Sequence, residues 1–317
     1  MSFGSFIRRL LGTIPLILGI SVVLFSIIHL APGSPLDFYA DNPNVTREAL
    51  EQMRVAFGLD KPVPEQYVRW LWAFLNGNWG ISFRTGQPVL EVILERLPAT
   101  LILSGSAFLL SLAIAIPIGV LAATRRYSKL DTFFTFVSFS GISIPVFWVG
   151  LMAQLVFAIW LGWLPAGGFQ TVGNGSFMDV LTHMVMPVCI LSFATIAGWS
   201  RYVRASLIDV IGQDYIRTAR AKGQTPRKVI WRHAVRNALL PIVTVVALDI
   251  VQIVSGAVIT ETIFSWPGIG RLFVESMDGR DYPVLMGLMM ISSFTMVAAN
   301  FAADMLYAVI DPRVRLA

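Results

Sequence analysis

The sequence has little charge and almost no cysteine for its 317 residues. Only 14% of the residues are charged, whereas soluble domains carry about a quarter; 56% are hydrophobic and the mean hydropathy is +0.70. These values exclude an ordinary soluble protein and predict an integral membrane protein. The single cysteine, Cys189, lies in an apolar run, so it forms no internal disulfide, and we interpret it as a small buried hydrophobic residue.

Several chemical signatures are also missing. There is no G-x-x-x-x-G-K-[S/T] phosphate loop, so we expect this chain not to hold ATP in the usual cradle. The metal motifs H-E-x-x-H and C-x-x-C and the nucleophile motif G-x-S-x-G are absent too, so we expect no catalytic residue and no metal site. Basic residues are confined to loops beside apolar segments, without interleaved aromatic residues, so we expect no nucleic-acid partner.

Long apolar segments are what the sequence has instead. About 20 apolar residues span a bilayer, so we predict an all-α, polytopic membrane protein. The fourth span is expected to continue past Arg201 as a cytoplasmic helix. The first resembles a signal peptide but is too long and lacks a suitable cleavage site, so we interpret it as an uncleaved helix. The six predicted transmembrane helices lie near residues 10–30, 99–123, 132–161, 183–199, 239–262 and 284–309.

Positive charge indicates how these helices are oriented. Lys and Arg occur at both termini and after the second and fourth helices, whereas residues 162–182 contain none. The positive-inside rule therefore places both termini in the cytoplasm. A short helix is predicted after Thr46, whose side chain would cap it. We divide the chain into residues 1–30 (cytoplasmic end and first helix), 31–98 (extracytoplasmic segment) and 99–317 (core of five transmembrane helices, including a cytoplasmic loop at 200–238).

One basic loop carries a helix pattern that topology alone does not require. Asp214 would start a helix that Gly223 closes, with Pro226 in the first turn of a second helix predicted to run to Pro241. A solvated loop kept inside by its charge would explain the basic residues. It would not explain the spacing of alanine and glycine.

This loop resembles the glycine-containing motif of bacterial ABC importer permeases. Residues 217–219 occupy the positions that the general pattern fills with E-A-A, and Gly223 occupies the glycine. Arg217 replaces the acid, and Pro241 falls about one helical turn later than the proline of the general pattern. In both respects the chain resembles the dipeptide/oligopeptide branch, whose members carry sequences similar to Y-x-R-T-A-R-A-K-G and H-x-x-R-N-A-x-x-P. Further tags follow in order over nearly the whole chain, among them HLAPGSP at 29–35, GISIP at 141–145 and WPGIGR at 266–271.

The resemblance implies the fold and work of a type I ABC importer permease, specifically its first permease subunit. Such a subunit imports di- or oligopeptides, or in the same branch nickel or glutathione. Its partners would be a second permease, two cytoplasmic ATPase subunits that hold ATP and Mg, and a solute-binding protein, at a bacterial inner membrane. The alternative from another class is an ion-coupled secondary transporter, which predicts an inverted repeat that we do not find. The implied ATPase-coupling residues are Tyr215, Arg217, Ala219, Arg220, Ala221, Lys222 and Gly223.

An acidic residue, Asp249, lies near the middle of the fifth predicted helix. A charge there costs at least ~2.5 kcal/mol on insertion scales, so it should face protein or water. With Gln252 and Ser255 it forms a polar strip at helical spacing. We interpret this strip either as part of a translocation path, near a peptide's amino group, or as a polar contact between helices. Glu261, near the outer end of the same helix, is a candidate contact for the binding protein, and prolines 117, 145, 187 and 241 are candidate kinks.

Overall fold

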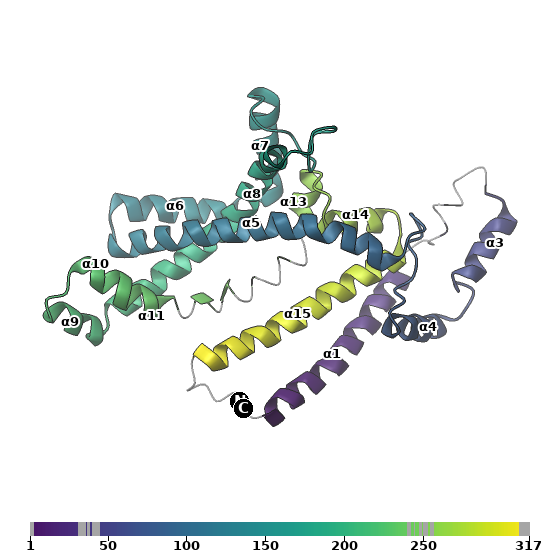
Figure 1. The fold of residues 1–317 in the computed structure, drawn as a ribbon, viewed down its shortest axis with the longest axis horizontal. Helices are drawn as coiled ribbons and strands as arrows, with labels where there is room; N and C mark the ends of the chain where they lie inside the picture. The colour runs from purple at the N-terminus through teal and green to yellow at the C-terminus, as the bar shows by residue number, and fades with distance from the viewer. Residues whose placement is uncertain are drawn as a thin grey trace. The chain divides into compact units, whose positions relative to one another are not determined.

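The computed structural model describes residues 3–30, 36, 39, 45–239, 242–243, 245–246, 249, 253 and 257–310, with side chains described between residues 12 and 301. The regular elements among these residues are all helical, which confirms the predicted all-α class (Figure 1). Residues 1–98 and 268–298 form one compact unit, here unit 1, and residues 99–267 and 299–316 form unit 2. The predicted division at residues 30 and 98 concerns the sides of a membrane and stays a prediction.

Unit 1 is built around the ends of two long helices. Phe25 and Ile28 of α1 (Phe3–Leu30) pack against Leu285 and Met286 of α15 (Tyr282–Ile310). Thr46 caps the next helix by accepting a hydrogen bond from the Ala49 amide at 3.2 Å, as predicted. The other helices of unit 1 are α3 (Arg47–Ala56), α4 (Val63–Leu75), the first turns of α5 (Val89–Thr124) and α14 (Ile269–Asp278).

Asp281 fixes the start of α15. Its carboxylate is buried and accepts hydrogen bonds from the Ser82 hydroxyl and from the amides of Phe83 (3.1 Å) and Arg84 (3.4 Å). A carboxylate at this position also complements the positive end of the helix dipole. One side chain therefore holds the loop before α5 against the N-terminus of α15.

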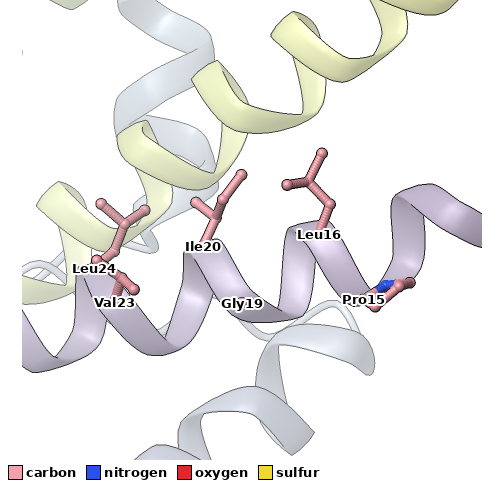
Figure 2. A pocket seen from close by; sticks show the side chains of 6 residues that line it. All are labelled: Pro15, Leu16, Gly19, Ile20, Val23 and Leu24. Carbon is pink, nitrogen blue, oxygen red and sulfur yellow. The ribbon is translucent and has the colours of Figure 1, made fainter.

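A shallow apolar groove of about 350 Å³ runs along α1 (Figure 2). Its walls are formed within this single helix, and both Leu16 and Val23 are more than half exposed. Such a surface suits lipid chains or another apolar helix, not a polar cargo. The lining residues are Pro15, Leu16, Gly19, Ile20, Val23 and Leu24.

Unit 2 consists of helices packed around α5 and α8. At Gly119 of α5 an added Cβ would lie 2.5 Å from the Cβ of Val203 and 2.7 Å from the carbonyl oxygen of Ser200, so only glycine allows this approach of α5 to α8. The elements of unit 2 are the remainder of α5, α6 (Lys129–Ser143), α7 (Val146–Ala153), the π-helix η1 (Gln154–Trp160), α8 (Phe177–Ile211), α9 (Asp214–Ala221), α10 (Pro226–Lys228), the π-helix η2 (Val229–Val235), α11 (Arg236–Ala238), α13 (Val258–Ile263) and the end of α15 from residue 299.

A bidentate ion pair joins α6 to α8. Arg204 donates from Nε to Oδ1 of Asp131 at 2.6 Å and from Nη2 to Oδ2 at 2.8 Å, and the Tyr127 amide adds a third hydrogen bond at 3.0 Å. Asp131 is buried, whereas the Arg204 side chain is 28% exposed. This geometry satisfies the carboxylate, which would be costly to bury alone.

The described residues contain four helices long and apolar enough to span a membrane: Gly12–Leu30, Val89–Thr124, Phe177–Ile211 and Tyr282–Phe301. They agree with the first, second, fourth and sixth predicted spans, and α8 continues well past Arg201, as expected. The fifth predicted span, residues 239–262, is described only in part, and Pro241 lies outside the described residues.

The third predicted span, residues 132–161, is not one straight helix. It consists of α6 followed by α7 and η1, bent by 99° at the break between Ser143 and Val146. The bend arises at Pro145, because a proline disfavours helical dihedrals in the residue before it, and Ile144 is accordingly extended (φ −88°, ψ 128°). Counting this pair as one span gives up to five within the described residues, roughly consistent with six in all. Pro187 and Pro117, by contrast, lie within α8 and α5 without ending either helix.

Candidate coupling surface and polar cavity

The predicted coupling helix exists with nearly the predicted limits. α9 begins at Asp214 and ends in a Schellman motif, in which the Gly223 amide donates to the Arg220 carbonyl (2.9 Å) and the Gln224 amide to the Ala219 carbonyl (3.4 Å). Gly223 has φ +73°, in the left-handed region that glycine adopts without strain. The role predicted for this glycine in local structure is therefore confirmed.

A second helical segment folds back beside α9 (Figure 1). It starts at Pro226 and continues through α10, η2 and α11 to Ala238. Its middle is π-helical over seven residues, which the sequence analysis did not predict. Asn237 donates from Nδ2 to the hydroxyl of Tyr215 at 3.2 Å, which ties the second segment to α9.

The two segments and the end of α8 share one hydrophobic core. Ile216 and Ala219 of α9 are buried against Val203 and Leu207 of α8 and against the second segment. Ala219, one of the seven expected coupling residues, therefore faces the chain's own interior and supports α9 from beneath. The second segment contributes Val229, Ala234, Val235 and Ala238 to this core.

The opposite face of α9 is exposed and basic. Arg217 lies within 3.4 Å of Asp214, but both side chains are largely exposed, so this ion pair contributes little. Trp231, which the sequence analysis did not single out, is 52% exposed on the neighbouring segment. We call the exposed residues of this region the α9 face: Tyr215, Arg217, Arg220, Ala221, Lys222, Gly223 and Trp231.

The composition of the α9 face is typical of a protein interface. Tyrosine, tryptophan and arginine are the residue types enriched where proteins meet, and Arg227, Lys228 and Arg232 extend the positive charge. Such a surface complements an acidic groove on a partner.

A half-open cavity of about 480 Å³ lies within unit 2, between α5, α8 and the described part of residues 245–257, and sets a few polar side chains in a mostly apolar lining. Trp199 of α8 is buried and donates from Nε1 to Oδ2 of Asp249 at 2.7 Å. The Phe108 ring packs edge-on against Trp199, with centroids 5.3 Å apart and planes at 89°. The described lining residues are Ser104, Ala107, Phe108, Ser111, Leu191, Ala194, Thr195, Gly198, Trp199, Tyr202, Val245, Asp249, Ile253 and Ala257.

One wall of this cavity holds a buried hydroxyl without a partner. Ser104 is 5% exposed, and its Oγ forms no hydrogen bond with any described residue. The hydroxyl of Ser111, two turns further along α5, donates to the carbonyls of Ala107 (2.7 Å) and Ser192 (3.4 Å). Because buried polar groups are nearly always paired, the Ser104 hydroxyl marks a place where a ligand or water can bind.

Comparison with known proteins agrees with the helical architecture. Residues 115–316 match the family described as binding-protein-dependent transport system inner membrane component, and residues 3–104 match the N-terminal region of these membrane components. The chain belongs to this family. It is therefore a transport permease, and the family resemblance found in the sequence is confirmed.

Named relatives extend over the full length of this permease. The oligopeptide transport system permease protein AppB of Bacillus subtilis is 45% identical over 310 residues, covering 97% of this chain and 98% of that protein. The dipeptide transport system permease protein DppB of Escherichia coli (strain K12) is 37% identical over 334 residues, covering 98% of each. A structure of the MetNI methionine ABC transporter in an inward-facing conformation has a TM-score of 0.57 over 70% of this chain and 97% of that chain. At 16% identity it supports the type I importer fold alone.

Of the three residues predicted to line the translocation path, Asp249 is the one that the structure describes. Asp249 both lines a cavity and contacts another helix, so the two interpretations of this residue each have a structural basis. Gln252 and Ser255 lie outside the described residues. The sequence analysis missed Trp199 and Ser104. No local pattern could have paired Trp199 with a carboxylate 50 residues away.

Two other expectations about the permease are corrected. Glu261 is fully buried and accepts a hydrogen bond from the Thr100 hydroxyl at 2.9 Å, so it presents no surface to a binding protein in this conformation. Cys189, expected to be buried, is exposed on α8, where an apolar environment of lipid explains its place in an apolar run.

Proposed function

We propose that this chain is the permease subunit that carries di- or oligopeptides across a bacterial inner membrane in an ATP-driven importer, with both termini in the cytoplasm. The single observation that carries the proposal is the α9 face: an exposed, basic, aromatic surface on a helix closed by a Schellman glycine. The peptide cargo is supported by relatives named for oligopeptide and dipeptide transport over 97–98% of this chain.

In this function the α9 face docks on a cytoplasmic ATPase subunit. ATP and Mg are held by two such partner subunits, which accords with the lack of a phosphate loop here. A second permease completes the pore, and a solute-binding protein delivers the peptide from outside. Arg217, Arg220 and Lys222 contact acidic residues of the ATPase, and the buried Ala219 holds α9 to the permease.

The docking part of the proposal is tested by charge reversal. Arg220→Glu on the α9 face should abolish co-purification of the ATPase subunits, because like charges placed together at an interface cost several kcal/mol. Arg125→Glu is the matched control, since Arg125 is an exposed arginine of another loop that is predicted to face the same side. If both variants lose the ATPase equally, or neither does, the basic residues serve the membrane or general charge and not this docking site.

The transport part is tested with the reconstituted complex. Proteoliposomes containing both permeases, the ATPase subunits and the binding protein should accumulate a labelled tripeptide only when ATP is supplied. Unlabelled peptide should compete with the label, whereas nickel and glutathione should not. Accumulation driven by an ion gradient without ATP would replace this proposal with a secondary transporter. Competition by nickel or glutathione alone would reassign the cargo within the same branch.

A further inference from the structure

The cavity in unit 2 carries an unbalanced negative charge. Among the lining residues that the structure describes, Asp249 is the one carboxylate, and none is Lys, Arg or His. Its Oδ2 is fixed by Trp199, and no donor to its Oδ1 occurs among the described side chains and amides. A carboxylate that is half-buried and paired only with a neutral N–H attracts a cation, because charge in a confined site is compensated by an opposite charge.

The rest of the cavity suits a small, partly apolar molecule with a polar backbone. Its volume of about 480 Å³ lies within the range of ligand pockets, which is roughly 300–1,000 Å³. Phe108, Tyr202 and Leu191 supply apolar wall, and the Ser104 hydroxyl supplies a buried group that still lacks a partner. A peptide has the complementary parts: an ammonium group at its N-terminus, and carbonyl groups that accept hydrogen bonds from a hydroxyl.

We propose that Asp249 binds the N-terminal ammonium group of the transported peptide, and that the Ser104 hydroxyl donates a hydrogen bond to one of the peptide's carbonyl groups. This inference rests on the proposed peptide-import function. An ammonium group is common to all unmodified peptides whatever their side chains, so a single carboxylate can receive many sequences. Trp199, itself held edge-on by Phe108, positions the carboxylate and leaves Oδ1 for the ligand.

A matched substitution separates this role from a purely structural one. Asp249→Asn removes the charge but keeps an oxygen that accepts the hydrogen bond from Trp199, so the contact between the helices is retained. Trp199→Phe does the reverse, since it removes the donor and leaves the carboxylate in place. If Asp249 serves only to join helices, Trp199→Phe should reduce peptide uptake more than Asp249→Asn, which should leave uptake unchanged.

The charge of the cavity can be measured with thiol reagents. Cys189 is the chain's single cysteine and is exposed, so Cys189→Ser gives a permease chain without cysteine, on which labelling is read by mass spectrometry. Thr195→Cys then places one thiol on the cavity wall, a helical turn from Trp199. In the purified complex in detergent, we compare the rates at which cationic aminoethyl methanethiosulfonate and the anionic sulfonatoethyl reagent modify this thiol. The ratio of the cationic rate to the anionic rate should fall about tenfold when Asp249→Asn is added. An unchanged ratio would overturn the proposal that this charge acts on the cavity.

Protection of the same thiol reports on the ligand itself. Trialanine should slow modification in the complex that retains Asp249, and N-acetyl-trialanine, which lacks the ammonium group, should not. Asp249→Asn should remove the difference between the two peptides, and Ser104→Ala should weaken protection by trialanine several-fold while preserving the preference for the free amine. Equal protection by both peptides, or protection by neither, would overturn the inference.

The outcome for peptide import is read separately. ATP-driven accumulation of labelled tripeptide by the complex with an unaltered permease tests the proposed function, whatever the role of Asp249. If the complex imports the tripeptide but the protection assay shows no preference for the free amine, the role of Asp249 is rejected and the peptide function stands. An absence of import would reject the peptide function, and the ammonium site with it.

Discussion

Gly223 offers the sharpest test of the α9 face, because its two possible roles make different predictions. The residue has φ +73° and closes α9, yet an added Cβ would meet no atom within 4 Å. A substitution there therefore brings backbone strain but no clash within the permease. Replacement by Asn and by Asp compares two side chains of nearly the same shape that differ in charge.

The cost to the fold follows from the backbone conformation. A typical L-residue in the left-handed region costs about 1–2 kcal/mol, and Asn and Asp lie at the low end because they adopt it more readily. About 1 kcal/mol alters the equilibrium of a local turn roughly fivefold. The core beneath α9, with Ile216 and Ala219, is untouched. Both variants should therefore insert in the membrane and keep α9.

The cost to docking differs between the two variants. Gly223→Asp puts a carboxylate on a basic face that is proposed to meet acidic residues of an ATPase, where like charges cost several kcal/mol. We expect this variant to abolish ATP-driven uptake in proteoliposomes, whereas Gly223→Asn retains much of it. Co-purification of the ATPase subunits should follow the same order, and hydrogen exchange of the α9 amides should be similar in both variants.

Two results would refute this reasoning. Uptake by Gly223→Asp at the rate of the unaltered protein would show that the α9 face does not dock where we propose. Equal loss of uptake in both variants, together with fast exchange of the α9 amides, would show that Gly223 acts through the fold and not through a partner.

Three further predictions concern packing and polar contacts. Gly119→Ala should lower the melting temperature of the purified complex, because overpacking costs about 1–3 kcal/mol of stability. Gly105→Ala on the same helix, with open space at its Cβ, should be neutral or slightly stabilising. Equal effects of the two substitutions would contradict the close approach of α5 to α8. Asp131→Ala should destabilise the α6–α8 contact by about 2–4 kcal/mol in the same assay, because it leaves the partly buried guanidinium of Arg204 without its carboxylate; a change below about 0.5 kcal/mol would place this pair among surface ion pairs. Asp281→Ala should speed hydrogen exchange of the amides at residues 83 and 84, and unchanged exchange would mean that the backbone alone holds this loop.

The local limits of α9 and α3 could be predicted because their signals lie within a few residues. A cap such as Thr46 and a C-terminal glycine such as Gly223 act on the adjacent turn, whatever the rest of the chain does. The bend at Pro145 was foreseeable as a kink for the same reason. Its angle of 99° was not, because it depends on what α7 packs against, and α7 lies against α8 and α13.

The features that sequence analysis missed depend on distant contacts. Which face of α9 is buried is decided by Val203 and Leu207 of α8, so the inward position of Ala219 could not be read from the alanine spacing alone. The hydrogen bond from Trp199 to Asp249 and the isolated hydroxyl of Ser104 require knowledge of which helices are neighbours. The π-helical turns left no recognisable pattern in the sequence.

α8 has 35 residues and is therefore roughly 52 Å long, well beyond the ~30 Å hydrocarbon thickness of a bilayer. It holds Trp199 at the cavity and, about one and two turns later, Val203 and Leu207 in the core beneath α9, with no loop between them. We therefore expect a displacement of α9 to tilt α8 and to shift the indole that anchors Asp249. The same continuous helix thus connects the surface proposed to dock on the ATPase with the carboxylate proposed to hold the cargo, so a helix-breaking substitution in α8 between residues 199 and 207 should uncouple ATP hydrolysis from transport.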